Sequence, residues 1–180
     1  MHMRTLALLL GLGTALLLPA TEPRAQQAQI PTLQVCNKTE ARGTGIVKID
    51  SRVDSTHSGT FKIRLELACD VEGYPTGQIA VTGLSMTDSI VEGTWASTSI
   101  EQLTSVGEAT PTLYVNGRCR AERAPGCRFW LMAADNRKGT KGTPDIVSFL
   151  VLDGKGQRVA YATGPVVDPR GDIIIAPTSN

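Results

Sequence analysis

The segment Phe61–Cys69 has the sequence FKIRLELAC, in which every second residue is apolar. Lys, Arg, Glu and Ala occupy the positions between them. Because successive side chains of a β-strand point to opposite faces, this alternation predicts a strand with one face buried and the other in water. The segment therefore favours a β-structure for the region around it.

Further apolar or alternating runs follow along the chain, separated by turn-forming residues, and no long helical period interrupts them. The turns include residues 73–77 (GYPTG), 125–126 (PG) and 153–156 (DGKG). We therefore expect an all-β fold, a small antiparallel β-sandwich of about eight or nine strands. Besides Phe61–Cys69, the expected strands are Ile46–Ile49, Gln78–Leu84, Ile90–Ala96, Thr112–Cys119, Cys127–Ala134, Asp145–Leu152, Gln157–Thr163 and Asp172–Ala176.

The segment after Thr98 has two interpretations. Thr98 followed by Glu101 has the spacing of a capping box, which predicts one helical turn over residues 99–105. Ile100 and Leu103 equally suit the apolar positions of an edge strand. The sequence leaves both interpretations open.

Residues 1–25 have the three-part order of a secretory signal peptide. A basic residue, Arg4, precedes the apolar run Leu6–Leu18, and Pro19 and Ala20 follow it. The apolar run is shorter than the roughly 20 residues that cross a bilayer as a stable helix. The sequence thus predicts a cleaved signal rather than a permanent anchor.

The rest of the chain is expected to form a polar leader over residues 26–32 and a single domain over residues 33–180. An exported chain of this kind is expected in the periplasm or outside the cell, with no membrane span after signal removal. Removing residues 1–25 lowers the basic residues from 18 to 16 and the acidic residues from 17 to 16. Nucleic-acid binding and stable attachment to anionic lipid usually need a basic excess, so neither is expected.

Four cysteines follow the export signal, and an even number in an oxidising compartment indicates disulfides. Three pairings are possible. The turn at residues 125–126 favours a hairpin that joins Cys119 to Cys127, which leaves Cys36 to pair with Cys69. A zinc site would need close ligand pairs of the Cys-x-x-Cys kind, and the sequence has none, so no metal or other cofactor is expected.

The candidate ligand-binding residues follow from this hairpin. If Cys119 and Cys127 face the core, the opposite face carries Tyr114, Arg118, Arg128 and Trp130, with Arg118 directly across from Arg128. Like charges so placed are unfavourable unless they are solvated or share an anion, and aromatic rings beside arginines suit sugars or acidic glycans. In the alternative interpretation, the rings pack under a neighbouring loop while the arginines extend into water.

Catalytic residues are scarce. His57 is the one histidine after the predicted signal, and its neighbours in residues 54–59 do not form a nucleophile motif. Asp135 and Asp145 bracket a loop and are candidates for a carboxylate pair in glycoside hydrolysis or, with Asn136, for calcium binding. Three nearby cations oppose the calcium interpretation.

The C-terminal third carries a run of core and turn residues that includes Phe129-Trp130, Asp135-Asn136, Pro144-Asp145, Asp153-Gly154, Tyr161, Gly164-Pro165 and Gly171-Asp172-Ile173. This run resembles the C-terminal strands of uncharacterised exported bacterial β-sandwich proteins. The resemblance covers about 50 residues, and it implies a fold and a compartment but no activity.

Taken together, these observations favour an exported, non-enzymatic binding or structural module whose ligand is a carbohydrate or an anionic molecule. The alternative is a small secreted hydrolase that uses loop carboxylates. The partner is not identified by the sequence.

Overall fold

The computed structural model describes residues 35–50, 56–87, 93–138 and 141–177. The fold belongs to the unit Leu33–Asn180. The predicted signal peptide and leader lie outside the described residues.

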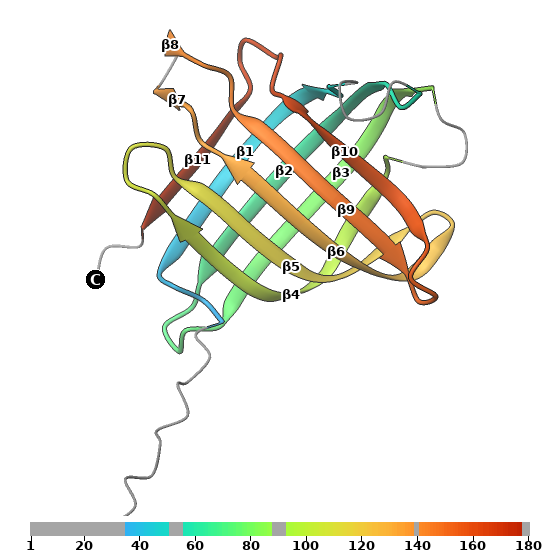
Figure 1. Ribbon diagram of the computed structural model, residues 1–180. Helices are drawn as coiled ribbons and strands as arrows, with labels where there is room; N and C mark the ends of the chain where they lie inside the picture. Colours follow the sequence, from blue (N-terminus) through green and yellow to red (C-terminus); the bar gives the residue numbers. More distant parts are fainter. Residues whose placement is uncertain (1–34, 51–55, 88–92, 139–140, 178–180) are drawn as a thin grey trace, which may run out of the picture. The chain divides into compact units, whose positions relative to one another are not determined.

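The described part of the chain contains β-strands and no helix (Figure 1). The strands are β1 (Thr39–Lys48), β2 (Gly59–Cys69), β3 (Pro75–Met86), β4 (Trp95–Val106), β5 (Thr112–Ala121), β6 (Ala124–Ala134), β7 (Arg137–Lys138), β8 (Lys141–Gly142), β9 (Ile146–Asp153), β10 (Arg158–Pro165) and β11 (Asp172–Pro177). No helix in this part is long and apolar enough to cross a membrane.

Nine of the strands form one antiparallel sheet in the order β10-β9-β6-β5-β4-β3-β2-β1-β11, and β7 and β8 form a small hairpin. The sheet curls into a half-barrel (Figure 1). The buried apolar side chains form the core on its inner face. The prediction of an all-β antiparallel fold is confirmed. The predicted sandwich needs correction, because the described strands form one continuous curled sheet and not two clearly separate layers.

Backbone contacts join β10, at one end of the curled sheet, to β1, the strand next to the other end. The Asp50 amide near the end of β1 donates to the Thr163 carbonyl of β10 over 2.7 Å, and Val47 forms an isolated bridge with Val166. The free edge of β11 is satisfied by side chains, because Ile173 N donates to Asp145 Oδ2 over 2.9 Å. Backbone groups that an open edge would leave unpaired are thereby satisfied.

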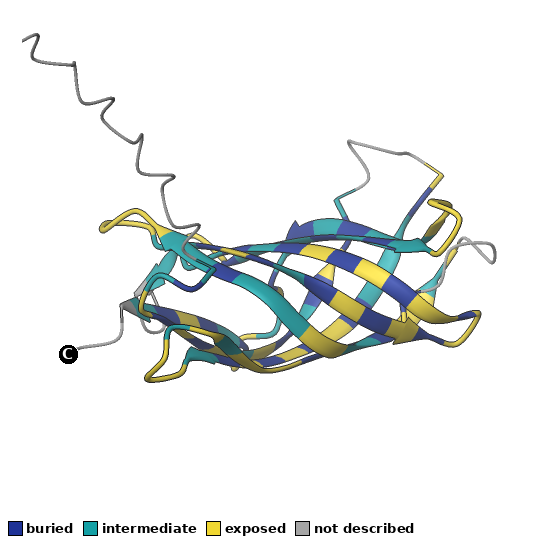
Figure 2. Ribbon diagram, turned by 90° about the horizontal axis from the view of Figure 1, so that it is seen from below, coloured by how far each residue is buried: buried dark blue, intermediate teal, exposed yellow. Residues whose placement is uncertain are grey.

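The core follows from strand alternation, which Figure 2 shows as buried and exposed residues in turn along several strands. In β2, the apolar residues of the predicted alternation are buried up to Leu67. Four aromatic side chains pack inside the curl: Trp95 stacks on Phe129 with ring centroids 4.9 Å apart, and Phe149 meets both Trp95 and Phe61 edge-on. Such aromatic contacts add to the apolar area that the core buries.

The helical turn predicted over residues 99–105 is wrong, and the strand interpretation is correct. These residues belong to β4, with Leu103 fully buried. The pairing of β4 with β5 is irregular between Ser97 and Ser99 and again between Ile100 and Gln102. These β-bulges interrupt the simple alternation that identifies a strand in the sequence.

Both predicted disulfides are present. Cys119 pairs with Cys127 inside the β5–β6 hairpin, with Cα atoms 4.9 Å apart. Cys36 pairs with Cys69 at the end of β2, with Cα atoms 5.7 Å apart. Two disulfides are consistent with an oxidising, exported compartment.

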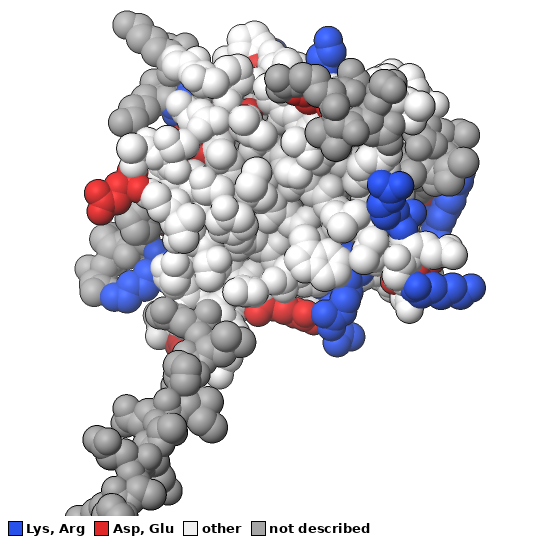
Figure 3. Space-filling model, viewed as in Figure 1, with Lys and Arg blue, Asp and Glu red and all other residues white. Residues whose placement is uncertain are grey.

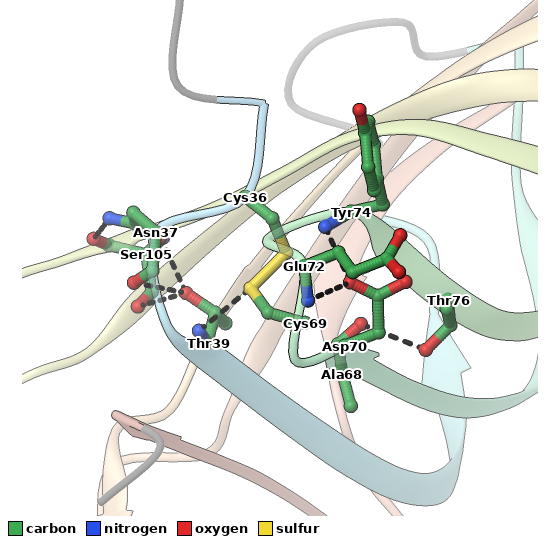
Figure 4. Close-up of a disulfide and its surroundings, with 10 residues drawn as sticks. All are labelled: Cys36, Asn37, Thr39, Ala68, Cys69, Asp70, Glu72, Tyr74, Thr76 and Ser105. Carbon is green, nitrogen blue, oxygen red and sulfur yellow. Dashed lines mark hydrogen bonds between the residues drawn. A yellow bond between two sulfur atoms is a disulfide. The ribbon is translucent and has the colours of Figure 1, made fainter. Parts of the chain in front are cut away.

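The Cys36–Cys69 bond holds the start of the described chain against the sheet (Figure 4). Leu103 of β4 donates its amide to Val35 O over 2.8 Å, and Ser105 N donates to Asn37 Oδ1 over 2.9 Å. The Asn37 side-chain amide donates in return to the Ser105 carbonyl over 2.9 Å. This segment covers part of the β4 edge, which pairs with β3 through only two residue pairs.

Candidate functional site

The candidate site lies on the outer face of the β5–β6 hairpin. In this hairpin Cys119 pairs with Cys127 and Arg118 with Arg128, so the predicted register is confirmed. The cysteines are buried, whereas the two arginines are exposed on the opposite face. The disulfide therefore fixes which side chains of both strands face outward.

A third side chain lies between the two arginines. The Glu101 carboxylate is 2.9 Å from Arg118 Nε through its Oε1 and 3.5 Å from Arg128 Nη1 through its Oε2. Glu101 is the extra residue of the bulge between Ile100 and Gln102 in β4. A bulge redirects the side chain at its position, which explains how a residue outside the regular pairing reaches both arginines.

The anion expected from the sequence between Arg118 and Arg128 is thus the Glu101 carboxylate of the chain itself. Sequence reasoning missed Glu101 in this role because its spacing from Thr98 suggested a helix cap. No local pattern reveals the ion pair, since Glu101 comes from a strand whose register with β5 is broken by bulges.

Tyr114 and Trp130 are exposed on the same face, by 46% and 43%. Tyr114 pairs with Met132, and Trp130 pairs with Asn116, so the two rings are diagonal neighbours. Side chains in that relation are roughly 7–8 Å apart, within reach of one ligand. Figure 3 shows a broad uncharged area on the side where β5, β6 and β9 face the viewer, with charged groups at its margin.

A shallow hollow of about 260 Å³ lies at these rings. Its polar groups are neutral: the Asn116 side-chain nitrogen donates to Gln102 Oε1 over 2.8 Å, and Ser148 also lines the hollow. The lining residues are Gln102, Tyr114, Val115, Asn116, Trp130, Leu131, Met132, Ser148, Phe149 and Leu150, none of which carries a charge.

The structure thus divides the four predicted site residues into two pairs. It brings Tyr114 and Trp130 together at the hollow, where no loop of the described chain buries them. Arg118 and Arg128 lie together beside Glu101 and do not line the hollow. Whether any of the four binds a ligand stays a prediction.

His57 is fully buried, unlike a residue that meets a substrate at the surface. Its ring stacks on Tyr161 with centroids 4.0 Å apart, and Nε2 lies 2.7 Å from the Tyr161 carbonyl oxygen, to which it donates. Asp54, three residues before His57, lies outside the described residues.

Asp145 is also fully buried. Its Oδ1 accepts hydrogen bonds from the amides of Asn136 and Arg137, over 2.9 and 3.0 Å, while its Oδ2 accepts from Ile173. Asp135 Oδ2 accepts from the Ile175 amide over 3.1 Å. The two carboxylates considered for hydrolysis or calcium binding therefore connect the loop after β6 to the edge of β11.

Across the described ranges, no three His, Cys, Asp or Glu side chains gather as ligands for a metal ion would. The structure adds no candidate cofactor site to the residues considered from the sequence.

No family model, curated protein or solved structure matches this chain. The resemblance of the C-terminal third to exported bacterial proteins therefore stays a prediction.

Proposed function

We propose that this chain is exported and acts as a non-enzymatic binding module that holds a neutral carbohydrate against Tyr114 and Trp130. One observation carries the proposal: two half-exposed aromatic rings lie diagonally across one hairpin, at a hollow with no charged lining residue. Flat rings of this kind bury the apolar faces of sugars while polar neighbours bind their hydroxyl groups.

The polar groups at the hollow suit sugar hydroxyls. The Asn116 and Gln102 amides are both donors and acceptors, and they are bonded to each other over 2.8 Å. Ser148 and Thr163 share a second hydrogen bond, of 2.7 Å, next to the rings. A hydroxyl-rich ligand can join either pair without leaving a charge unpaired.

The Glu101 carboxylate at the margin of the aromatic face favours a neutral ligand over an anionic one. Glu101 already contacts both Arg118 and Arg128, so an incoming anion would meet a carboxylate between them. We assign the arginines the role of holding Glu101 at the edge of the aromatic face.

Export and a periplasmic or extracellular location are part of the proposal. The predicted signal peptide at residues 1–25 supports them, as do the two disulfides, since exported proteins keep such bonds oxidised.

Binding is preferred to catalysis because the candidate catalytic groups are engaged in the fold. Both oxygens of Asp145 accept backbone hydrogen bonds, and His57 is buried against Tyr161. Glycoside hydrolysis needs two carboxyl groups on either side of the scissile bond in an accessible cleft. Asp145 is not accessible in this sense.

Affinity electrophoresis of the exported protein tests the proposal, in gels that contain hydroxyethylcellulose, laminarin or galactomannan. We expect at least one of these neutral polysaccharides to retard the protein, and Trp130→Ala and Tyr114→Ala to remove the retardation. Tyr74→Ala is the matched control, because Tyr74 is 59% exposed in the turn before β3 and far from the hollow in the pairing order. No retardation, or equal loss in all three variants, would contradict the proposal.

A further inference from the structure

A larger hollow, of about 1140 Å³, lies on the outer face of β11, β1, β2 and β3. It has no aromatic residue and is lined by charged and small polar side chains above the backbone of these strands. Its charged residues are Glu40, Arg42, Lys62, Arg64, Glu66, Arg170 and Asp172.

The strand register gives the order of the charges along this hollow. Glu40 pairs with Ala68 at one end, and Arg42 pairs with Glu66 one step along. Toward the other end, Arg64 pairs with Thr44, and Lys62 follows it. Glu40 and Glu66 thus lie next to Arg42, and Arg64 and Lys62 lie further along, where Asp172 pairs with Thr44 and adds one carboxylate. Arg170 precedes β11, which starts opposite Thr44, so it lies on the side of Arg64.

The guanidinium groups of this hollow have no partner within the described part of the chain. Arg118 and Arg128 contact Glu101, and Arg137 donates to the Gly171 carbonyl over 2.7 Å. Arg42 and Arg64 make no comparable contact, although Glu66 pairs directly with Arg42 in the sheet. Arg42 and Arg64 are diagonal neighbours across β1 and β2, and neighbouring like charges are unfavourable unless water or an anion neutralises them.

We propose that this hollow binds a carboxylate-bearing oligosaccharide, with the carboxylates of the sugar held by Arg42 and Arg64. Guanidinium groups form strong paired hydrogen bonds with carboxylates. Glu40 and Glu66, next to Arg42 in the register, accept hydrogen bonds from sugar hydroxyls. This site is separate from the aromatic face and does not depend on the function proposed for it.

The lining argues against other anionic partners. Single-stranded nucleic acids are usually held by aromatic side chains that stack on the bases, and none lines this hollow. An acyl chain would need a continuous apolar surface, whereas Ile174 is the one large apolar side chain of the lining that is exposed. A polymer with a charge on every unit and no hydroxyls would meet the Glu40 and Glu66 carboxylates next to Arg42.

The raised pKa of Asp172 is compatible with an anionic ligand in this hollow. Burial and the neighbouring Asp145 carboxylate raise the pKa of Asp172 above its usual value. At a given pH, a carboxyl group with a raised pKa carries less negative charge than an ordinary one, so it opposes an anion less.

Titration calorimetry of the full exported protein tests this inference with an oligomer of galacturonic acid and with its methyl ester. The ester has the same sugar backbone without the charges. We expect the acid to bind and the ester to bind at least about tenfold more weakly, and Arg42→Gln and Arg64→Gln to weaken binding of the acid by about tenfold or more. Arg120→Gln is the matched control, since Arg120 is exposed, lacks an ion pair in the described structure and lies outside this hollow.

The inference is overturned if acid and ester bind alike, if the acid does not bind, or if Arg120→Gln weakens binding as much as Arg64→Gln. Vesicles of phosphatidylglycerol and chains of polyphosphate are tested in parallel. Arg64-dependent binding of either, without binding of the oligouronate, would replace the proposed ligand. Unchanged acid binding by Trp130→Ala would show that this site is independent of the aromatic face.

Discussion

Arg118 and Arg128 lie directly opposite each other on the β5–β6 hairpin, and the Glu101 carboxylate contacts both. The hairpin disulfide sets the outward direction of the arginines, and the bulge in β4 sets that of Glu101. A repulsive pair that the hairpin register requires is thus neutralised by a residue of the adjacent strand.

Glu101→Gln should leave the two arginines as an uncompensated like-charged pair. Because all three side chains are partly exposed, we expect a loss of only about 0.2–1 kcal/mol in the free energy of unfolding. The variant should also gain an anion site, so sulfate should raise its melting temperature more than chloride does at equal ionic strength. Glu122→Gln and the wild-type protein serve as controls for the general effect of sulfate. An equal rise in melting temperature in all three proteins would argue against a Glu101 carboxylate shared by the two arginines.

The two tryptophans should differ in their contribution to stability. Trp95 is 2% exposed and packs against Phe129 and Phe149, so Trp95→Ala should lower the free energy of unfolding by about 3–5 kcal/mol. Trp130→Ala should cost far less, since its ring is half-exposed. Urea unfolding of both variants measures the difference. A loss for Trp130→Ala as large as that for Trp95→Ala would make Trp130 a core residue.

The two disulfides should stabilise the fold to different extents. In the chain-entropy description, the longer loop closed by Cys36 and Cys69 contributes about 3.8 kcal/mol, and the loop closed by Cys119 and Cys127 about 2.6 kcal/mol. Urea unfolding of the two double alanine variants compares them. The variant without Cys36 and Cys69 should also lose protection of the Leu103 amide in hydrogen exchange, because this disulfide holds the Val35 carbonyl against that amide. Retained protection would mean that the segment docks without the disulfide.

Asp172 should make stability depend on pH. Its pKa is raised in the folded state, first by burial and then by Asp145, so folding favours its protonated form. That contribution is fully present below the unfolded pKa and is lost as the pH rises through the folded pKa. Asp172→Asn should therefore gain stability relative to the wild type as the pH rises from about 3 to neutral. Asp168→Asn is the control, and an Asp172→Asn difference that does not vary with pH would contradict the assignment.

Several features could be predicted from local sequence alone. The strict alternation of Phe61–Cys69 identified β2, and the hairpin expected between Cys119 and Cys127 has the predicted register. The turn of that hairpin was misplaced, because it lies at Glu122-Arg123, and residues 125–126 belong to β6 beside a bulge. These features depend on residues close together in the chain, and they placed Tyr114 and Trp130 on one outer face.

The remaining features depend on contacts between distant segments. The first half of β1 was missed because Gly43 and Gly45 occupy inner positions, where an added Cβ would collide with β11 or with Val166. The single curled sheet follows from pairings such as Val47 with Val166, which no local pattern encodes. The role of Glu101 depends on a bulge, which has no reliable sequence signal.

The most direct test of the central proposal uses the indole N–H signals of Trp95 and Trp130, the two tryptophans of the chain. Proton–nitrogen correlation spectra are recorded while neutral cello-, laminari- and manno-oligosaccharides are added to the exported protein. The proposal predicts that at least one of them shifts the Trp130 signal in a saturable way while the buried Trp95 signal stays in place. If none of these sugars moves the Trp130 signal, the aromatic face is not a carbohydrate-binding site.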